Sequence, residues 1–289
     1  MQRFQKILFP VDFSERSQAA APFVLSLAQR YGAKVALLHA IQPSPPLYAG
    51  MNTVYPETID YSGIQTDMEI RLRQFAADEL PKVECTCAVE LGDPATVITE
   101  FAEAGKFELI AMPTHGYGAF RRFLLGSVTA KVLHDSKAVV WTSAHAPEPD
   151  HRAHPKPRRI VTALDLKPES LHTLEAALEI AAESEATLEI LHVAPEGEIT
   201  PYKPEGRIQE LLQQAAREVP LRVSQTPLAD VEVVTDGNDV PKLIRELVLR
   251  QRADLVVIGR GVMQGALGGF RTEAFNIIRE APCPVLSVP

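Results

Sequence analysis

The first half of this 289-residue chain returns, motif by motif, in its second half. An apolar run ending in aspartate occurs twice, as KILFPVD and as RRIVTALD, and each is followed by an amphipathic segment and a second apolar run that closes on a Leu-His pair. The aspartates Asp12 and Asp165 are 153 residues apart, and so are His39 and His192. Such internal repetition predicts two copies of one folding unit.

Later landmarks keep a shorter separation: 145 residues lie between Gly92 and Gly237, and again between Gly116 and Gly261. The change in spacing places the variable segment of the repeat between its second and third predicted strands. A proline- and histidine-rich stretch without apolar periodicity, SAHAPEPDHRAHPKP, separates the copies. We therefore predict domains at 1–143 and 158–289, joined by an exposed linker at 144–157.

Each half alternates short apolar runs with amphipathic segments, which is the pattern of βαβ units around a parallel sheet. Helices are predicted at Ser14–Tyr31, with Ser14 as the N-cap, and at Pro168–Ser184. The fold class predicted is α/β, two tandem doubly wound domains, each a five-stranded parallel sheet flanked by helices. In the first half the strands predicted are Lys6–Pro10, Lys34–His39, Cys85–Glu90, Glu108–Met112 and Ala138–Thr142.

Function is expected where strands end, because ligands of doubly wound folds bind beyond the carboxyl ends at the point where strand order reverses. The segment Met112–Thr129 brings glycines and the pair Gly126-Ser127 to the start of a predicted helix, where free N–H groups attract phosphate. The alternative is a glycine-rich turn with a capping serine. Asp12 at the same edge can accept bonds from ribose or adenine, or cap the helix that follows it.

These motifs resemble those of the universal stress protein family. The resemblance rests on PVDFSE at 10–15, LLHAI at 37–41, GDPATVI at 92–98, and Gly116 followed nine residues later by Gly126-Ser127. It covers nearly the whole chain as two tandem domains. It implies an adenine nucleotide alpha hydrolase-like fold and, in members with the Gly-x2-Gly-x9-Gly-Ser/Thr signature, a site for ATP or another adenine nucleotide, with or without magnesium.

Carried over by position, the resemblance implies a nucleotide site in the first half. One residue departs from the family pattern: Pro113 stands at the first glycine, and proline lacks an N–H and restricts φ. Pro10, Val11 and Asp12 would meet adenine and ribose, Ala40 would line the adenine slot, and Met112 would pack near base and ribose. The backbone around His115, Gly116, Gly126, Ser127, Val128 and Thr129 would hold the phosphates.

The second half matches this pattern less well, and we interpret its site as degenerate and structural. Arg271-Thr272-Glu273 occupies the place of Gly-Ser and a neutral residue. Arg271 prevents the close approach of the backbone to a ligand, and Glu273 places negative charge where phosphates would lie. The alternative is that Arg260 and Arg271 hold an anion through their side chains. A weak second site would comprise Asp165, Gly259, Gly261, Arg271 and Thr272.

Two further features favour the first half as the ligand-bearing one. The connection Gln42–Gly63, which carries Tyr48, Tyr55 and Tyr61, is long for a βα loop and suggests a lid or simple loop anchoring. Arg121, Arg122 and Lys131 would raise the potential around phosphates, or would be ordinary solvated cations.

Charge and composition exclude several partners. A formal net charge of −8 at pH 7 gives no general basic face for nucleic acid or anionic membranes. Neither a membrane-spanning run nor a signal peptide is recognisable, and the three cysteines form no metal-binding spacing, so we expect a cytoplasmic protein without a metal centre.

No P-loop, nucleophile elbow or carboxylate pair is recognisable, so no catalytic residue is predicted. The leading hypothesis is a stress-response protein that uses the nucleotide as a regulatory ligand and has an unidentified protein partner. The alternatives are a ligand-free scaffold, and a slow ATPase or self-phosphorylating protein with Ser127 or Thr129 as acceptor. The family resemblance also implies that AVVWT and VLSVP pair the two halves as an intra-chain pseudo-dimer, and chains can further form a homodimer.

Overall fold

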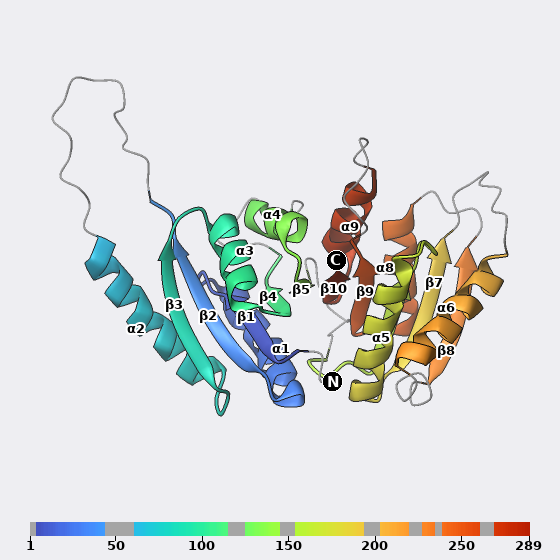
Figure 1. Ribbon diagram of the computed structural model, residues 1–289, viewed down its shortest axis with the longest axis horizontal. Coiled ribbons are helices and arrows are strands. Elements are labelled where there is room, and N and C mark those ends of the chain that lie inside the picture. Colours follow the sequence, from blue (N-terminus) through green and yellow to red (C-terminus); the bar gives the residue numbers. More distant parts are fainter. Residues whose placement is uncertain are drawn as a thin grey trace, which may run out of the picture.

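The computed structural model describes residues 4–43, 61–114, 125–144, 154–193, 203–219, 227–234, 239–260 and 269–289. Ten strands form one continuous sheet in the order β3-β2-β1-β4-β5-β10-β9-β6-β7-β8, with β3 at one end and β8 at the other (Figure 1). The first five positions of this order belong to the first half of the chain and the last five to the second half. The α/β fold class and its tandem repeat are confirmed.

The strands of the first half begin and end within two residues of their predicted bounds, and β1 matches its prediction. The parallel pairing of β2 with β1 and β3, and of β4 with β1 and β5, gives a five-stranded unit. The bounds are β1 Lys6–Pro10, β2 Lys34–Ile41, β3 Cys85–Leu91, β4 Leu109–Met112 and β5 Val139–Thr142, then β6 Arg159–Ala163, β7 Thr187–Val193, β8 Leu228–Val234, β9 Leu255–Gly259 and β10 Val285–Val288.

The two halves meet where β5 and β10 pair antiparallel, with Trp141 opposite Leu286. Every other strand pair in the sheet is parallel. Side chains add to this joint, since the hydroxyl of Ser287 donates to the carbonyl oxygen of Val140 at 3.2 Å. The expected pairing of AVVWT with VLSVP is therefore observed, and the halves form an intra-chain pseudo-dimer.

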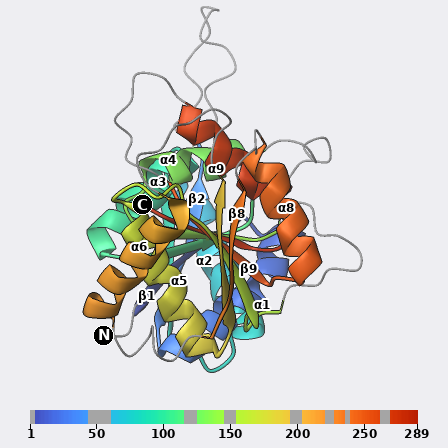
Figure 2. The same ribbon diagram turned by 90° about the vertical axis from the view of Figure 1, so that its right-hand side faces the viewer.

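Helices cover both faces of the sheet and bury a separate hydrophobic core on each (Figure 2). Alternation along β1 shows how one strand serves both cores, because Ile7 and Phe9 pack in one and Leu8 in the other. One face carries α1 Glu15–Tyr31, α2 Tyr61–Glu79, α5 Ser170–Ser184 and α6 Pro204–Glu218, and the other carries α3 Pro94–Gly105, α4 Ser127–Asp135, α8 Val240–Gln251 and α9 Gly269–Glu280.

Local capping sets the helix starts. Ser14 is the N-cap of α1, as predicted, and its side chain accepts from the N–H of Ser17. The first turn expected at Pro168 is wrong by two residues, because α5 begins at Ser170. None of the helices in the described parts of the chain has the length and apolar character required to cross a bilayer.

Candidate functional site

The strand order reverses once in each half, and the space outside the strand ends at each reversal, between β1 and β4 and between β6 and β9, is here called the crevice of that half. In the first half β1 lies between β2 and β4, so the chain leaves β1 in one direction and returns to β4 on its other side. Ligands of doubly wound folds bind at such a reversal, outside the carboxyl ends of the two strands. Asp12 follows β1, and Pro113 and Thr114 follow β4, so the crevice between β1 and β4 collects the residues that the sequence indicated.

Helix α4 is fixed to the end of β4 by two hydrogen bonds. The N–H of Gly126 donates to the carbonyl oxygen of Thr114 at 2.9 Å, and the buried hydroxyl of Thr129 donates to the carbonyl oxygen of Pro113 at 3.1 Å. The amide of Gly126 is thus satisfied inside the chain. Gly126 is the N-cap and forms no side-chain cap bond, and no acceptor among the described residues meets the N–H groups of Ser127, Val128 and Thr129, the remaining donors of the first turn.

Asp12 organises the start of α1. Its Oδ1 accepts from the N–H of Ser14 at 3.0 Å and from the hydroxyls of Ser14 and Ser17, each at 2.6 Å. Asp12 itself does not cap α1, because the N-cap is Ser14, but this one oxygen holds the capping serine in place. Among the described residues no donor reaches Oδ2, and the Asp12 side chain is only half-buried. The carboxylate thus combines a structural oxygen with a second one that can accept from a ligand. The sequence did not single out Ser17, because no motif indicates that its hydroxyl bonds to Asp12 five positions earlier.

The ends of β1 and β2 are tied together by His39, whose Nδ1 lies 2.7 Å from the carbonyl oxygen of Val11. The second half repeats this contact, since Nδ1 of His192 lies 2.9 Å from the carbonyl oxygen of Leu164. The repeated histidines therefore hold adjacent strand ends at a fixed distance. Their recurrence in sequence marks this shared architecture.

The residues expected around the base differ in accessibility. Ala40 is half-buried at the end of β2, whereas Pro10 and Met112 are buried, and Met112 packs in the core beneath α3 and α4. Pro113 is buried as well and has a trans peptide bond. His115, Gly116, Arg121 and Arg122 lie outside the described residues, as does most of the loop expected to form a lid, and Tyr61 begins α2.

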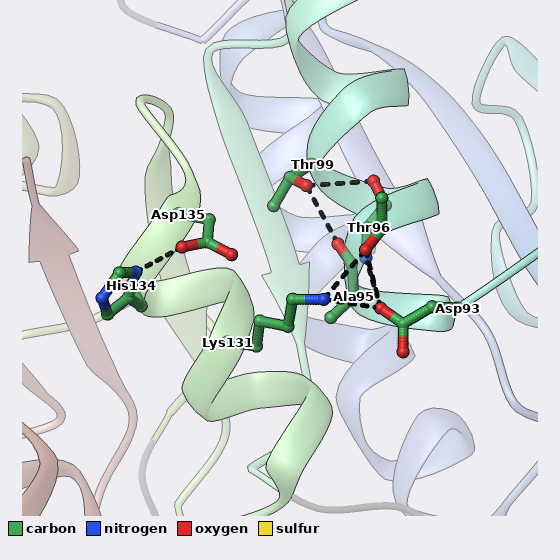
Figure 3. Close-up of polar contacts among 7 residues, drawn as sticks. All are labelled: Asp93, Ala95, Thr96, Thr99, Lys131, His134 and Asp135. Atoms are coloured by element: carbon green, nitrogen blue, oxygen red, sulfur yellow. Dashed lines mark hydrogen bonds and ion pairs between the residues drawn. The ribbon is translucent and has the colours of Figure 1, made fainter.

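Lys131 does not face the crevice as an unpaired charge. Its Nζ lies 2.9 Å from Oδ1 of Asp93 and 2.9 Å from the hydroxyl oxygen of Thr96, so it ties α4 to the first turn of α3 (Figure 3). Asp93 is also the N-cap of α3 and accepts from the N–H of Thr96 at 3.0 Å. The bonds from Lys131 and Thr96 hold the pKa of Asp93 at about 2. The charge of Lys131 is therefore paired with Asp93, and its effect on the potential around phosphates stays a prediction.

The equivalent crevice of the second half, between β6 and β9, differs at its aspartate. Oδ1 of Asp165 accepts from the hydroxyl of Ser170 at 2.6 Å, and Oδ2 lies 3.1 Å from Nζ of Lys167. Burial by itself would raise the pKa of Asp165, but the bonds from Ser170 and Lys167 together lower it. Both oxygens are engaged, in contrast to Asp12.

Gly259 has a packing role in this second crevice. A Cβ at this position would lie 2.8 Å from the hydroxyl oxygen of Thr173 on α5. Glycine therefore permits close helix–strand packing here. Gly261 and the side chains of Arg271 and Thr272 lie outside the described part of the structure. Within the described residues, no group of three His, Cys, Asp or Glu side chains is placed to hold a metal ion.

The anion-binding alternative for Arg260 is not what the structure shows. Its guanidinium turns away to the first half and donates to two carbonyl oxygens there, those of Leu133 and Ala138. Burial lowers the pKa of Arg260 to about 10. The side chain that would have held an anion in the second half is thus engaged across the domain joint.

Two doubly wound domains joined edge to edge through the antiparallel strands β5 and β10 define a class of tandem α/β proteins. The chain belongs to the universal stress protein family: the family model described as "Universal stress protein family" matches residues 3–142 and again residues 156–289.

Two similar proteins match nearly the full length of this chain, and a third matches half of it. A universal stress protein of Mycolicibacterium smegmatis is 27% identical over 299 residues, covering 98% of this chain and 96% of that protein. The crystal structure of a universal stress protein from Archaeoglobus fulgidus superposes with a TM-score of 0.69 at 22% identity, covering 98% of this chain and 95% of that one. A universal stress protein solved in complex with cAMP is 20% identical and covers 50% of this chain and 99% of its own, with a TM-score of 0.38.

Proposed function

We propose that the first half binds ATP or a related adenine nucleotide between the ends of β1 and β4, and that the nucleotide acts as a regulatory ligand of this stress protein. One observation carries the proposal. Among the described residues no side chain caps the first turn of α4, and this turn is fixed to the end of β4 at the reversal crevice. Unsatisfied N–H groups and the helix dipole at such a terminus favour anions by up to about 2 kcal/mol.

The phosphates would accept from the N–H groups of Ser127, Val128 and Thr129, and the exposed Ser127 would add its hydroxyl. Oδ2 of Asp12 is the group that would accept from ribose hydroxyls. Pro113 offers no N–H, so the ribose side of the site depends more on Asp12 than the family signature implies. Pro10, Val11, Ala40 and Met112 would surround the base, and magnesium would enter with the phosphates rather than at a protein cage.

The second half supplies a variant that tests this site. Glu273 stands where the first half has Val128, so Val128→Glu places a carboxylate in the first turn of α4. A carboxylate stabilises a helix N-terminus but repels phosphate, so the fold should survive while nucleotide binding is lost. Val128→Gln has the same shape without the charge and is the matched control.

Titration calorimetry with ATP, with and without magnesium, measures the effect. The expected result is binding by the wild type and by Val128→Gln and none by Val128→Glu. Saturating ATP should also raise the melting temperature, because a ligand at 100 times its Kd stabilises the folded state by about 2.7 kcal/mol. Absence of binding at millimolar ATP, together with absence of nucleotide in the denatured purified protein, would favour the scaffold alternative.

The burial of the two candidate acceptors distinguishes between them in the self-phosphorylation alternative. The hydroxyl of Thr129 is buried and donates to the carbonyl of Pro113, whereas Ser127 is exposed. Ser127 is therefore the acceptor to test. An increase in intact mass of one phosphoryl group after incubation with ATP, absent in Ser127→Ala, would support this activity in addition to binding.

A further inference from the structure

Arg260 lies in the second half, but its side chain forms hydrogen bonds with the first half. It follows β9 directly, and its guanidinium donates from Nη1 to the carbonyl oxygen of Leu133 at 2.7 Å and from Nη2 to the carbonyl oxygen of Ala138 at 2.5 Å. These acceptors lie 127 and 122 residues away in sequence. The contact therefore crosses the joint between the halves.

The two acceptors lie on either side of the connection from α4 to β5. Leu133 lies in the last turn, whose carbonyl groups have no partner inside the helix, and Ala138 leads directly into β5. A cation at a helix C-terminus also interacts favourably with the helix dipole. One planar guanidinium thus fixes the last turn of α4 relative to the strand that follows it.

The backbone of Arg260 is itself held rigidly. Its N–H donates to the carbonyl oxygen of Val288 at 2.7 Å, and the preceding Gly259 pairs with Val288 in the register of β9 and β10. Strand β10 in turn pairs with β5. The side chain therefore extends from the shared sheet. It holds the last turn of α4 in a fixed position relative to the sheet that contains β4.

We infer that Arg260 is a positioning residue for the phosphate-binding end of α4, supplied by the second half to the first. The inference rests on the proposed nucleotide site. Helix α4 has nine residues, a length of about 13 Å, so a displacement of its last turn moves its first turn as well. Phosphate affinity in the first half accordingly depends on a residue of the second half.

The test compares Arg260→Met, which removes both bonds, with Arg260→Lys, which keeps the charge but cannot span two carbonyls with a planar fork. Arg252→Met is the matched control, because it removes one exposed positive charge from the same half. Calorimetry with ATP and with adenosine separates the phosphate contacts from the base contacts. We expect ATP affinity to fall about three- to tenfold in Arg260→Met, less in Arg260→Lys, and not in Arg252→Met, with adenosine affinity unchanged.

Amide hydrogen exchange without nucleotide provides a readout that does not depend on the proposed function. Arg260→Met should exchange faster than wild type in α4 and equally in α3, whereas Arg252→Met should match wild type in both. If the wild type binds no ATP, the proposed function fails while the exchange in α4 still decides whether Arg260 positions this helix. Equal α4 exchange in Arg260→Met and Arg252→Met, or equal loss of ATP and adenosine affinity in Arg260→Met, would overturn the inference.

Discussion

The hydroxyl of Thr129 donates a hydrogen bond to the carbonyl oxygen of Pro113, across 16 positions of sequence and 3.1 Å of space. Pro113 stands where the family signature has a glycine, and proline cannot supply an N–H there. Its carbonyl nevertheless anchors the first turn of α4. The substitution therefore removes a backbone donor but leaves the connection between strand end and helix in place.

This bond gives a prediction for stability. Thr129→Val keeps the shape of the side chain but leaves the Pro113 carbonyl without its donor, so the free energy of unfolding should fall by about 1–3 kcal/mol. Thr129→Ser keeps the hydroxyl and should lose less. Urea unfolding measures both variants. Equal stability of Thr129→Val and the wild type would show that the bond contributes nothing.

A second prediction concerns Asp93 and pH. Its pKa is held at about 2 by the bonds from Lys131 and Thr96, below the ordinary value of about 3.9 that applies when the chain is unfolded. The stabilisation is therefore fully present above about pH 4 and is lost as the pH falls towards 2. Because both side chains are exposed to solvent, which screens their attraction, we expect the pair to contribute only slightly to stability.

Asp93→Asn is the variant that isolates this pair, since asparagine still caps α3 but carries no charge for Lys131. Urea midpoints at pH 6 should favour the wild type slightly, and the difference should shrink as the pH falls below 4, with most of it lost by about pH 2. High salt should reduce it as well. A difference that does not shrink between pH 4 and pH 2 would indicate that capping, rather than the ion pair, is responsible.

A third prediction concerns the packing of β9 against α5. Gly259→Ala would place a Cβ 2.8 Å from the hydroxyl oxygen of Thr173, a residue whose branched side chain has little rotamer freedom. Overpacking of this kind costs about 1–3 kcal/mol. Thr173→Ala removes the clashing oxygen, so the double variant should recover much of the loss. Thermal unfolding of the two single variants and the double variant tests the coupling, and simple additivity would argue against the contact.

Local features account for the parts of the fold that the sequence predicted well. The run ending at Pro10 has apolar residues for both faces of the sheet, so β1 could be predicted to the residue. Ser14 caps α1 because its bond to the N–H of Ser17 spans only three positions. The helix start at Ser170 was misplaced because proline is tolerated in the turn before a helix as well as in its first turn.

The candidate site was predicted in outline, and its individual donors and acceptors were not. The sequence placed Asp12 and Gly126 near the ends of β1 and β4. Only the structure shows that one oxygen of Asp12 serves α1 and that the amide of Gly126 bonds to Thr114. The sequence allows several hydrogen-bond partners for each of these atoms, and only the three-dimensional geometry selects one.

By itself, the sequence determined the duplicated α/β architecture and predicted the sheet edge at which we propose a ligand binds, because repetition, hydrophobic periodicity and glycine positions are visible in the order of residues along the chain. The tertiary structure alone decided that Lys131 is engaged by Asp93 and that Arg260 reaches the end of α4. These pairings join residues 38 and 127 positions apart, and which charges meet across such distances depends on how helices and strands pack.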